Sequence, residues 1–278
     1  MKSYTSLYKK SINQPPNDAF AFFWFDKDNG ETFETPYARL AQLAKPEKWN
    51  FIHEEYKKEG KDFPILMNYL NFTFMRLQEQ NKIVYSKDQR YAVFNTGLLT
   101  ETEKDIFAFF MSKENKSPNQ SDWMFKFFAD SYTDKLSAFD KTPEPATYIT
   151  EARDIVFDIA YGIEINFDHI LDGDNLDRLP KSVQSNPLLA RNAIKGSIEG
   201  LKPRLLRNYK IAIPHWYKGR IQLLLPLHIT DPVNPDVAMV AERDDSLRKY
   251  RIRTLLTMDM AYIDARLICR PDTEWLNP

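Results

Sequence analysis

The chain has 278 residues and a mass of 32.7 kDa, with a formal net charge of -1 and a pI of about 6.5. Aromatic residues make up 14% of it and only eight residues are glycine, which excludes a low-complexity or disordered chain. The sequence also has no run of about 18 apolar residues, the length that a membrane-spanning helix needs.

The start of the chain and its single cysteine indicate the cellular location of the protein. The first residues are followed by a polar stretch rather than by the apolar run of a signal peptide. Cys269 excludes an internal disulfide and is typical of a reducing compartment. We therefore expect a cytoplasmic protein without a membrane partner, and the sequence leaves the oligomeric state open.

The pattern of apolar and polar residues predicts a single α+β domain over residues 19–278, with a mixed, largely antiparallel sheet and flanking helices. Residues 1–18 are polar and contain Pro15 and Pro16, which is typical of a flexible N-terminal arm. The aromatic run at 19–25 predicts a buried strand or a strap over the core. The alternative is a set of exposed rings on which bases stack.

Two helices and a hairpin are expected next. Apolar spacing predicts a short helix near residues 40–44 and a longer one that begins at Pro64, since proline is favoured in a first helical turn. Residues 82–85 and 91–94 are typical of the two strands of a β-hairpin.

The end of this hairpin is a candidate anion site at Asn95, Thr96 and Gly97. Thr100 and Glu103 match a capping box, which predicts that a helix follows. Free backbone amides between a strand and a helix can bind an anion. The alternative is structural: Gly97 supplies a backbone conformation that favours glycine, and Asn95 caps the turn.

Residues 130–178 are acidic, with twelve Asp or Glu against four Lys or Arg. Such a segment forms a solvated face or a counter-surface to a basic region. Its aspartates and histidine are metal-ligand types, but their spacing does not match a calcium-binding loop and the distal Glu is missing. We expect a capped loop and no metal site. The side chains concerned are Asp168, His169, Asp172, Asp174 and Asp177.

The segment 186–228 has the most concentrated charge. Between residues 191 and 220, eight Lys or Arg stand against the single acid Glu199, a local balance of +7. One face of the expected helix is apolar, and Pro203 should divide that helix into two pieces because proline has no amide hydrogen. The apolar set is Leu189, Ala193, Ile194, Ile198, Leu201 and Leu205. The basic set is Arg191, Lys195, Lys202, Arg204, Arg207, Lys210, Lys218 and Arg220.

The C-terminal part alternates between apolar and polar residues, which predicts antiparallel strands. Arg220 and Gln222 are expected on the same sheet face as Arg251, Arg253 or both. The three strands are expected at 220–227, 237–240 and 250–254. The tail predicts an amphipathic helix from about Asp259 that ends before Pro271, with a further strand as the alternative.

A cluster of polar residues is the candidate active site, since the usual motifs of nucleophilic enzymes are absent from the sequence. These residues stand in apolar runs, where burial is costly unless each is paired. Lys210 and Arg266 would bind phosphate and Asp259 would transfer protons, so Lys210 and Asp259 are the catalytic candidates. The cluster comprises Asn95, Asn208, Lys210, Asp259 and Arg266. Further ligand-binding candidates are Thr96, Gly97, Arg204, Arg207, Tyr217 and Gln222.

Several stretches carry a resemblance to a known family. FNTGL at 94–98, NYKIAIP at 208–214, IQLLLPL at 221–227, and LLTMDMAYIDARLI at 255–268 with WL at 275–276 resemble the bacterial family catalogued as domain of unknown function 3825. The resemblance covers roughly residues 20–278. It implies work on RNA or nucleotides, because relatives occur beside RNA-associated modules, but it implies no particular activity, cofactor or catalytic residue. His215 departs from the neutral polar residue expected there, so we do not assign it as a base.

Three functional interpretations remain open. The first is a module that binds RNA or a nucleotide through the basic segment 191–220, with Trp216 and Tyr217 stacking on bases. The second is a nucleotide- or RNA-processing enzyme whose pocket is the polar cluster. The third is a protein-interaction scaffold in which the basic segment pairs with the acidic segment 130–178, and the near-neutral pI favours it. The sequence identifies no cofactor.

Overall fold

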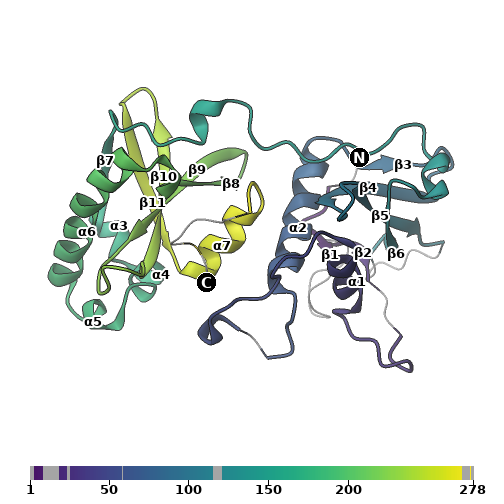
Figure 1. Cartoon of the computed structure of the whole chain (residues 1–278), viewed down its shortest axis with the longest axis horizontal. Coiled ribbons are helices and arrows are strands. Elements are labelled where there is room, and N and C mark those ends of the chain that lie inside the picture. The colour runs from purple at the N-terminus through teal and green to yellow at the C-terminus, as the bar shows by residue number, and fades with distance from the viewer. Residues whose placement is uncertain are drawn as a thin grey trace. The chain divides into compact units, whose positions relative to one another are not determined.

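The computed structural model describes residues 3–8, 19–23, 26–57, 59–114, 121–270 and 276 (Figure 1). The chain divides into two compact units. Unit 1 comprises Met1–Phe51 and Lys57–Thr147, and unit 2 comprises Ile52–Tyr56 and Tyr148–Pro278. Each unit has one sheet with helices packed on it, which confirms the expected α+β class. Sequence patterning alone predicts one domain over 19–278, because no Gly- or Ser-rich linker marks this division.

Unit 1 is built on a six-stranded mixed sheet in the order β1-β2-β6-β5-β4-β3. β1, β2 and β6 are parallel neighbours, and the remaining pairs are antiparallel. Phe74 of α2 packs against Phe20 of β2 and Phe94 of β4, with ring centroids 4.8 and 5.8 Å apart. The elements are β1 (Ser6–Tyr8), β2 (Ala19–Phe22), α1 (Thr35–Leu43), α2 (Pro64–Glu79), β3 (Val84–Tyr85), β4 (Tyr91–Leu99), β5 (Asp105–Ser112), β6 (Trp123–Asp130) and the 3₁₀ helix η2 (Asp134–Ala138).

The N-terminal strand β1 differs from the flexible arm expected for residues 1–18. Leu7 and Tyr8 are buried, and the Leu7 amide donates to Asn71 Oδ1 of α2 at 2.9 Å. Tyr4 and the strand Ser6–Tyr8 are therefore buried in unit 1 and do not form a flexible arm. Residues 9–18 lie outside the described part of the chain.

The helix predicted after Thr100 is wrong, since that stretch is strand β5. A four-residue turn joins β4 to β5: the Glu103 amide donates to the Thr100 carbonyl, and the Lys104 amide donates to Thr100 Oγ1. Residues 106–110 are buried without a break, because β5 lies inside the sheet and both of its faces are covered. An unbroken apolar run of this kind does not distinguish a buried strand from a buried helix.

The turn at Asn95, Thr96 and Gly97 is occupied by its own side chains. Asn95 Oδ1 accepts from the Gly97 amide at 2.8 Å, and Thr96 Oγ1 accepts from the Leu98 amide at 3.2 Å. Gly97 has a φ of +74°, and an added Cβ would lie 2.6 Å from the Tyr69 hydroxyl. The amides expected to bind an anion are thus already paired, and the structural alternative describes this turn.

Unit 2 is built on a five-stranded sheet in the order β7-β11-β10-β9-β8, in which only the β7–β11 pair is parallel. Ile194, Ile198 and Leu201 of α6 share a core with Leu223 and Met239 on one face of this sheet. The elements are η1 (Glu54–Tyr56), η3 (Ala152–Asp154), β7 (Gly162–Glu164), α3 (Phe167–Ile170), α4 (Gly173–Asp177), α5 (Lys181–Gln184), α6 (Pro187–Arg207), η4 (Tyr209–Ile211), β8 (Ile213–Tyr217), β9 (Arg220–Leu227), β10 (Val237–Asp244), β11 (Lys249–Leu256) and α7 (Met258–Arg266).

Helix α6 is continuous through Pro203, so the predicted division into two pieces is wrong. Asn186 caps its first turn by accepting from the Leu189 amide at 3.1 Å. Leu201 and Leu205 are buried on either side of Pro203 in the sequence, and this burial outweighs the lost hydrogen bond. Of the expected apolar face, only Leu189 differs clearly, with 48% exposure.

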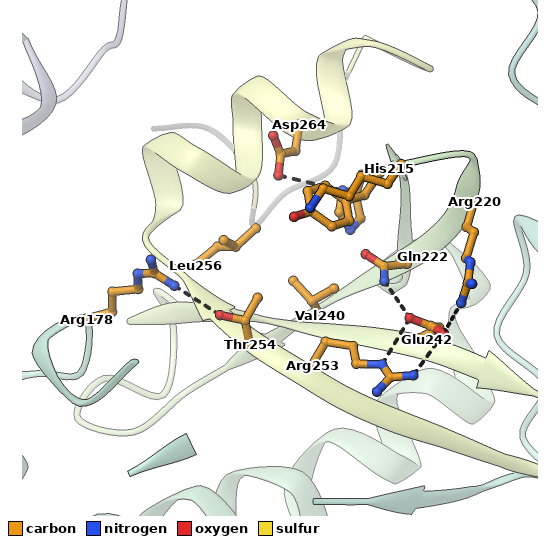
Figure 2. A pocket seen from close by; sticks show the side chains of 12 residues that line it. Arg178, His215, Arg220, Gln222, Val240, Glu242, Arg253, Thr254, Leu256 and Asp264 are labelled. Atoms are coloured by element: carbon orange, nitrogen blue, oxygen red, sulfur yellow. Dashed lines mark hydrogen bonds and ion pairs between the residues drawn. The ribbon is translucent and has the colours of Figure 1, made fainter. Parts of the chain in front are cut away.

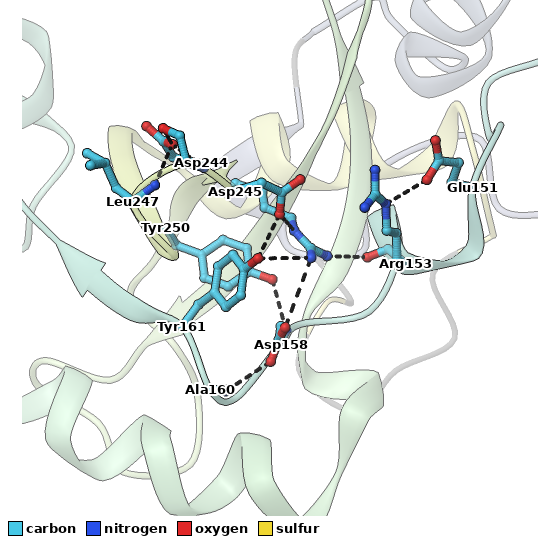
Figure 3. Close-up of polar contacts among 11 residues, drawn as sticks. Glu151, Arg153, Asp158, Ala160, Tyr161, Asp244, Asp245, Leu247 and Tyr250 are labelled. Atoms are coloured by element: carbon cyan, nitrogen blue, oxygen red, sulfur yellow. Dashed lines mark hydrogen bonds and ion pairs between the residues drawn. The ribbon is translucent and has the colours of Figure 1, made fainter.

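A guanidinium group ties the entry of unit 2 to its sheet (Figure 3). Arg243 of β10 donates to Asp245 Oδ1 at 2.6 Å and to the Arg153 carbonyl at 3.0 Å. It also lies over the Tyr161 ring, 4.8 Å from the centroid. The neighbouring Tyr250 hydroxyl accepts from the Asp158 amide at 2.8 Å. These contacts fix the segment before β7 against β10 and β11.

Across the described residues, no helix is long and apolar enough to span a membrane.

Replacing Asn95 with Ala should destabilise unit 1 by about 1–3 kcal/mol. Asn95 is fully buried, and its loss leaves the Gly97 amide and the Pro143 carbonyl without their partner. Urea unfolding would measure the change. Asn68→Ala is the control, since the Asn68 side chain makes a local bond to the Pro64 carbonyl inside a helix that Ala favours. Equal effects of the two substitutions would contradict a structural role for Asn95.

Replacing Pro203 with Ala should raise the free energy of unfolding of unit 2 by about 1–3 kcal/mol, because Ala supplies the missing amide hydrogen inside α6. Pro187→Ala, at the first helical position, should change it by less than about 0.5 kcal/mol. The two variants would be compared by urea unfolding. A Pro203→Ala protein no more stable than Pro187→Ala would show that the proline ring itself contributes to packing.

Candidate functional site

An open cavity of about 650 Å³ lies on the second face of the unit 2 sheet, where α7 packs (Figure 2). Core residues of β9 and β10 such as Leu223 and Met239 point to α6, and the alternate residues Gln222 and Val240 line the cavity. The lining comprises Arg178, His215, Tyr217, Lys218, Arg220, Gln222, Val240, Glu242, Arg253, Thr254, Leu256 and Asp264.

The β8–β9 hairpin sets the first wall of the cavity. Its two-residue turn, Lys218 and Gly219, has φ values of 45° and 87°, as a tight hairpin turn with right-handed strand twist requires. The resulting register sets His215 opposite Gln222. Because pairing with β10 holds β9 in place, a one-residue shift in this turn would move His215 to the α6 face, so the turn determines which residues of β8 reach the cavity.

A β-bulge sets the second wall. Val240 of β10 pairs with Thr254 of β11, and the next residue, Ala241, pairs with Ile252. Arg253 is the extra residue between them, so Arg253 and Thr254 both line the cavity although they are adjacent in the sequence. Bulges commonly redirect a side chain in this way next to functional sites.

The carboxylate of Glu242 joins three strands. It accepts from Gln222 Nε2 at 2.9 Å, from Arg220 at 2.7 Å, and from two nitrogens of Arg253 at 3.0 Å each (Figure 2). Burial raises the pKa of Glu242, but the hydrogen bonds from Arg253 and Gln222 outweigh this and hold it below the ordinary value. Glu242 is therefore ionised and fixes both guanidinium groups.

Arg178 lines the cavity and keeps its positive charge, because its hydrogen bonds go to neutral oxygens. Its guanidinium donates to Thr254 Oγ1 at 3.0 Å and to the Leu255 carbonyl at 2.6 Å, both neutral oxygens. Lys218 lies over the exposed ring of Tyr217, with the ammonium nitrogen 5.1 Å from the centroid. Such cations remain available to an anionic ligand.

His215 and Asp264 form the buried end of the cavity. His215 is 2% exposed, and neither of its ring nitrogens has a hydrogen-bond partner. Its Nδ1 lies 3.7 Å from Asp264 Oδ2 of α7. Burial lowers the pKa of His215 to about 4 and raises that of Asp264 to about 7. Around pH 6 the imidazole and the carboxyl are therefore both uncharged.

The sequence-predicted candidates are dispersed. Tyr217 and Gln222 line the cavity, as do Lys218 and Arg220 of the basic segment, and Arg253 lies on the same face as expected. Arg251 is the register partner of Glu242 and so shares this face, but it pairs with Asp244 at 2.8 Å and does not line the cavity. The remaining candidates, which do not appear in the cavity lining, are Asn95, Thr96, Gly97, Arg204, Arg207, Asn208, Lys210, Asp259 and Arg266.

The proposed polar cluster draws its members from both units. Asn95 belongs to unit 1, and the other four members belong to unit 2. Asn208 caps η4 by accepting from the Lys210 amide at 3.0 Å, and Asp259 accepts from the Thr257 hydroxyl at the start of α7. These two contacts are local, and the Asn95 side chain donates to the Pro143 carbonyl in unit 1 at 3.3 Å. Within the described residues, no group of three or more His, Cys, Asp or Glu side chains could hold a metal ion.

Sequence reasoning missed His215, Glu242, Arg178 and Asp264 as a group. A signal was present for two of them: Glu242 follows the apolar run of β10, and Asp264 precedes the inward residue Ala265 of α7. Their convergence depends on register and on the docking of α7, which residue spacing does not encode.

The His215–Asp264 pair predicts opposite pH effects for two substitutions. Between pH 4 and 6.5 the folded pair holds one proton on Asp264, and the unfolded pair, with ordinary pKa values, holds one on the histidine. As pH rises through this range, the lowered pKa of His215 increases the free energy of unfolding. The raised pKa of Asp264 decreases it by a similar amount, so the two effects cancel in the wild type. Asp264→Asn should gain stability relative to wild type as pH rises from about 4 to about 6.5, with a slope up to about 1.4 kcal/mol per unit. His215→Phe should lose stability relative to wild type over the same pH range. Urea unfolding at several pH values would measure both changes. Free energies of unfolding that change in parallel with pH in all three proteins would contradict the assignment.

The comparisons with known proteins identify the family of the chain. No curated protein and no solved structure matches the chain significantly. The family model described as Domain of unknown function (DUF3825) matches residues 40–275, a range that includes every residue lining the cavity. Because this match extends over most of the 278 residues, the chain belongs to the DUF3825 family.

Proposed function

We propose that this protein binds a phosphate-bearing nucleotide ligand, RNA or a free nucleotide, in the unit 2 cavity. The observation that carries the proposal is the gathering of four cationic side chains around one pocket, which are Arg178, Lys218, Arg220 and Arg253. A volume of about 650 Å³ lies within the range of small-molecule sites, about 300–1,000 Å³. The bacterial source and cytoplasmic location expected from the sequence belong to the same proposal.

The charge balance of the cavity supports an anionic ligand. Two carboxyl groups face the four cations, and Asp264 carries a full negative charge only above its raised pKa of about 7. Glu242 is already engaged by two guanidinium groups. Planar guanidinium donors match the oxygens of phosphate, and lysine adds a mobile point charge.

The alternative of an internal counter-surface is less well supported. The cations of the basic segment 191–220 are exposed. Lys202 pairs with Glu199 in its own helix at 2.6 Å, and Arg220 pairs with Glu242, which lies outside the acidic segment 130–178. Arg191 and Lys195 do lie over the Phe167 ring of the acidic segment, but an aromatic ring leaves their charge unneutralised. These exposed cations therefore favour an external anion over a scaffold held by internal ion pairs.

A second cationic surface, on α6 and η4, is the alternative RNA-binding site. The six other cations of the basic segment lie on α6 and η4, and α6 packs against the opposite face of the sheet from the cavity. They supply exposed phosphate contacts, as a non-specific RNA-binding surface would. Lys202 also lines a second pocket of about 620 Å³, whose other lining residues are mostly apolar. Separating the two surfaces is therefore the direct test of the proposal.

The test is binding of a fluorescently labelled single-stranded RNA across a salt series. Lys218→Asn with Arg220→Ala should weaken binding about tenfold or more, since both cations leave the cavity. Asn tolerates the positive φ at position 218, and Glu242 keeps Arg253 and Gln222 as partners, so the fold should be retained.

The matched comparison is Arg204→Ala with Arg207→Ala and Lys210→Ala, which removes three exposed cations from α6 and η4. This variant should keep its affinity within about threefold if the cavity holds the phosphate. Loss of RNA binding in this variant alone would place the binding site on α6 and η4 and not in the cavity. Absence of wild-type binding at low salt, together with no binding of a free nucleotide, would refute the proposed function.

A further inference from the structure

The cavity has a gradient of polarity from its exposed to its buried end. At the exposed rim, Tyr217 is 50% exposed and the side chains of Arg220 and Arg253 are 68% and 46% exposed. At the buried end, His215 is 2% exposed and Val240 is also 2% exposed. A ligand that fits this gradient has an anionic end and a neutral, partly apolar end.

The buried end holds hydrogen-bonding capacity that the protein does not use. Neither buried ring nitrogen of His215 makes a hydrogen bond of ordinary length, since even Asp264 Oδ2 lies 3.7 Å from Nδ1, although such groups are nearly always hydrogen-bonded in folded proteins. Leaving them unpaired is unfavourable, and a phenyl ring would avoid the cost. An unpaired polar group beside a cavity is therefore more simply explained by a ligand than by packing.

The chemistry of this end suits a heterocycle rather than a second anion. Asp264 keeps 29% side-chain exposure, and its pKa of about 7 leaves its carboxyl uncharged at slightly lower pH. A neutral carboxyl offers one donor and one acceptor side by side, and nucleobase edges present the same pattern. Val240 and Leu256 add apolar surface against which a planar ring can lie.

We propose that the cavity takes one nucleotide unit with its base inserted at the buried end, against Asp264 and His215, and its phosphate at the cationic rim. This inference rests on the proposed function and extends it from phosphate binding to recognition of a base. It assigns His215 and Asp264 as specificity-determining residues. The nucleotide is either free or the end of an RNA strand, because a terminal nucleotide can present both its base and its phosphate.

The test compares three kinds of probe by titration calorimetry with the full chain. The probes are the four common nucleoside 5′-monophosphates, ribose 5-phosphate and inorganic phosphate. At least one nucleotide should bind about tenfold more tightly than ribose 5-phosphate, since the base adds contacts that the sugar phosphate lacks. His215→Phe and Asp264→Leu should each lower nucleotide affinity about tenfold and leave ribose 5-phosphate affinity unchanged. Arg220→Ala is the contrasting variant and should weaken both ligands alike.

Thermal unfolding keeps these variants interpretable. His215→Phe removes two unpaired buried nitrogens, so its melting temperature should equal or exceed that of the wild type. If ribose 5-phosphate binds as tightly as every nucleotide, or if a folded His215→Phe protein keeps its preference for the nucleotide, base insertion is wrong and phosphate binding stands. If none of the probes and no RNA binds, the proposed function fails and the inference fails with it.

A competition experiment identifies the source of the nucleotide. A linear RNA with a 5′-phosphate and a covalently circular RNA of the same sequence would each compete with the bound monophosphate. Competition by the linear form alone assigns an RNA end, and competition by neither assigns a free nucleotide. Equally strong competition by the circular RNA would overturn the requirement for a terminal or free nucleotide.

Discussion

The carboxylate of Glu242 is the interaction on which the cavity depends. It accepts hydrogen bonds from Arg220 and Gln222 of β9 and from Arg253 of β11, so side chains from three adjacent strands meet at one acid. Two guanidinium groups this close would repel each other without a shared anion. Because Glu242 neutralises only one positive charge, the group keeps a net positive charge and a fixed geometry, two properties that phosphate recognition requires.

The alternation of the sheet links this group to the stability of unit 2. Residues such as Leu223 and Met239 form the core with α6, and Gln222 and Val240, their neighbours in sequence, face the cavity. The bulge at Arg253 interrupts the alternation on β11 and adds a guanidinium to the cavity face without removing Ile252 from the core. The site is therefore built on strands whose other face is packed, which restricts its motion.

The sequence predicts those parts of the structure that depend on local pattern. The α2 helix after Pro64, the β3–β4 hairpin and the three strands β9, β10 and β11 follow from spacing alone. The helix expected after Thr100 fails because a strand buried on both faces lacks any alternation. The division of α6 at Pro203 fails because packing of Leu201 and Leu205 outweighs a local penalty. Of the cavity, Gln222 and Tyr217 were expected, but the pairing of His215 with Asp264 was not, since α7 brings them together from positions far apart in the chain.

Charge along the sequence and charge in space differ in this protein. The segment 191–220 has a balance of +7, yet the sheet divides it: the cations of α6 lie on the side of the core helix, and Lys218 and Arg220 lie at the cavity. At the cavity, Arg178 and Arg253 join them from outside the segment. A charge count over residues 191–220 therefore combines the α6 surface with the cavity. It also omits two of the four cations that line the cavity. If the cavity is the phosphate site, as proposed, affinity should depend on salt as for the few cations gathered there and not as for the seven net charges of the segment.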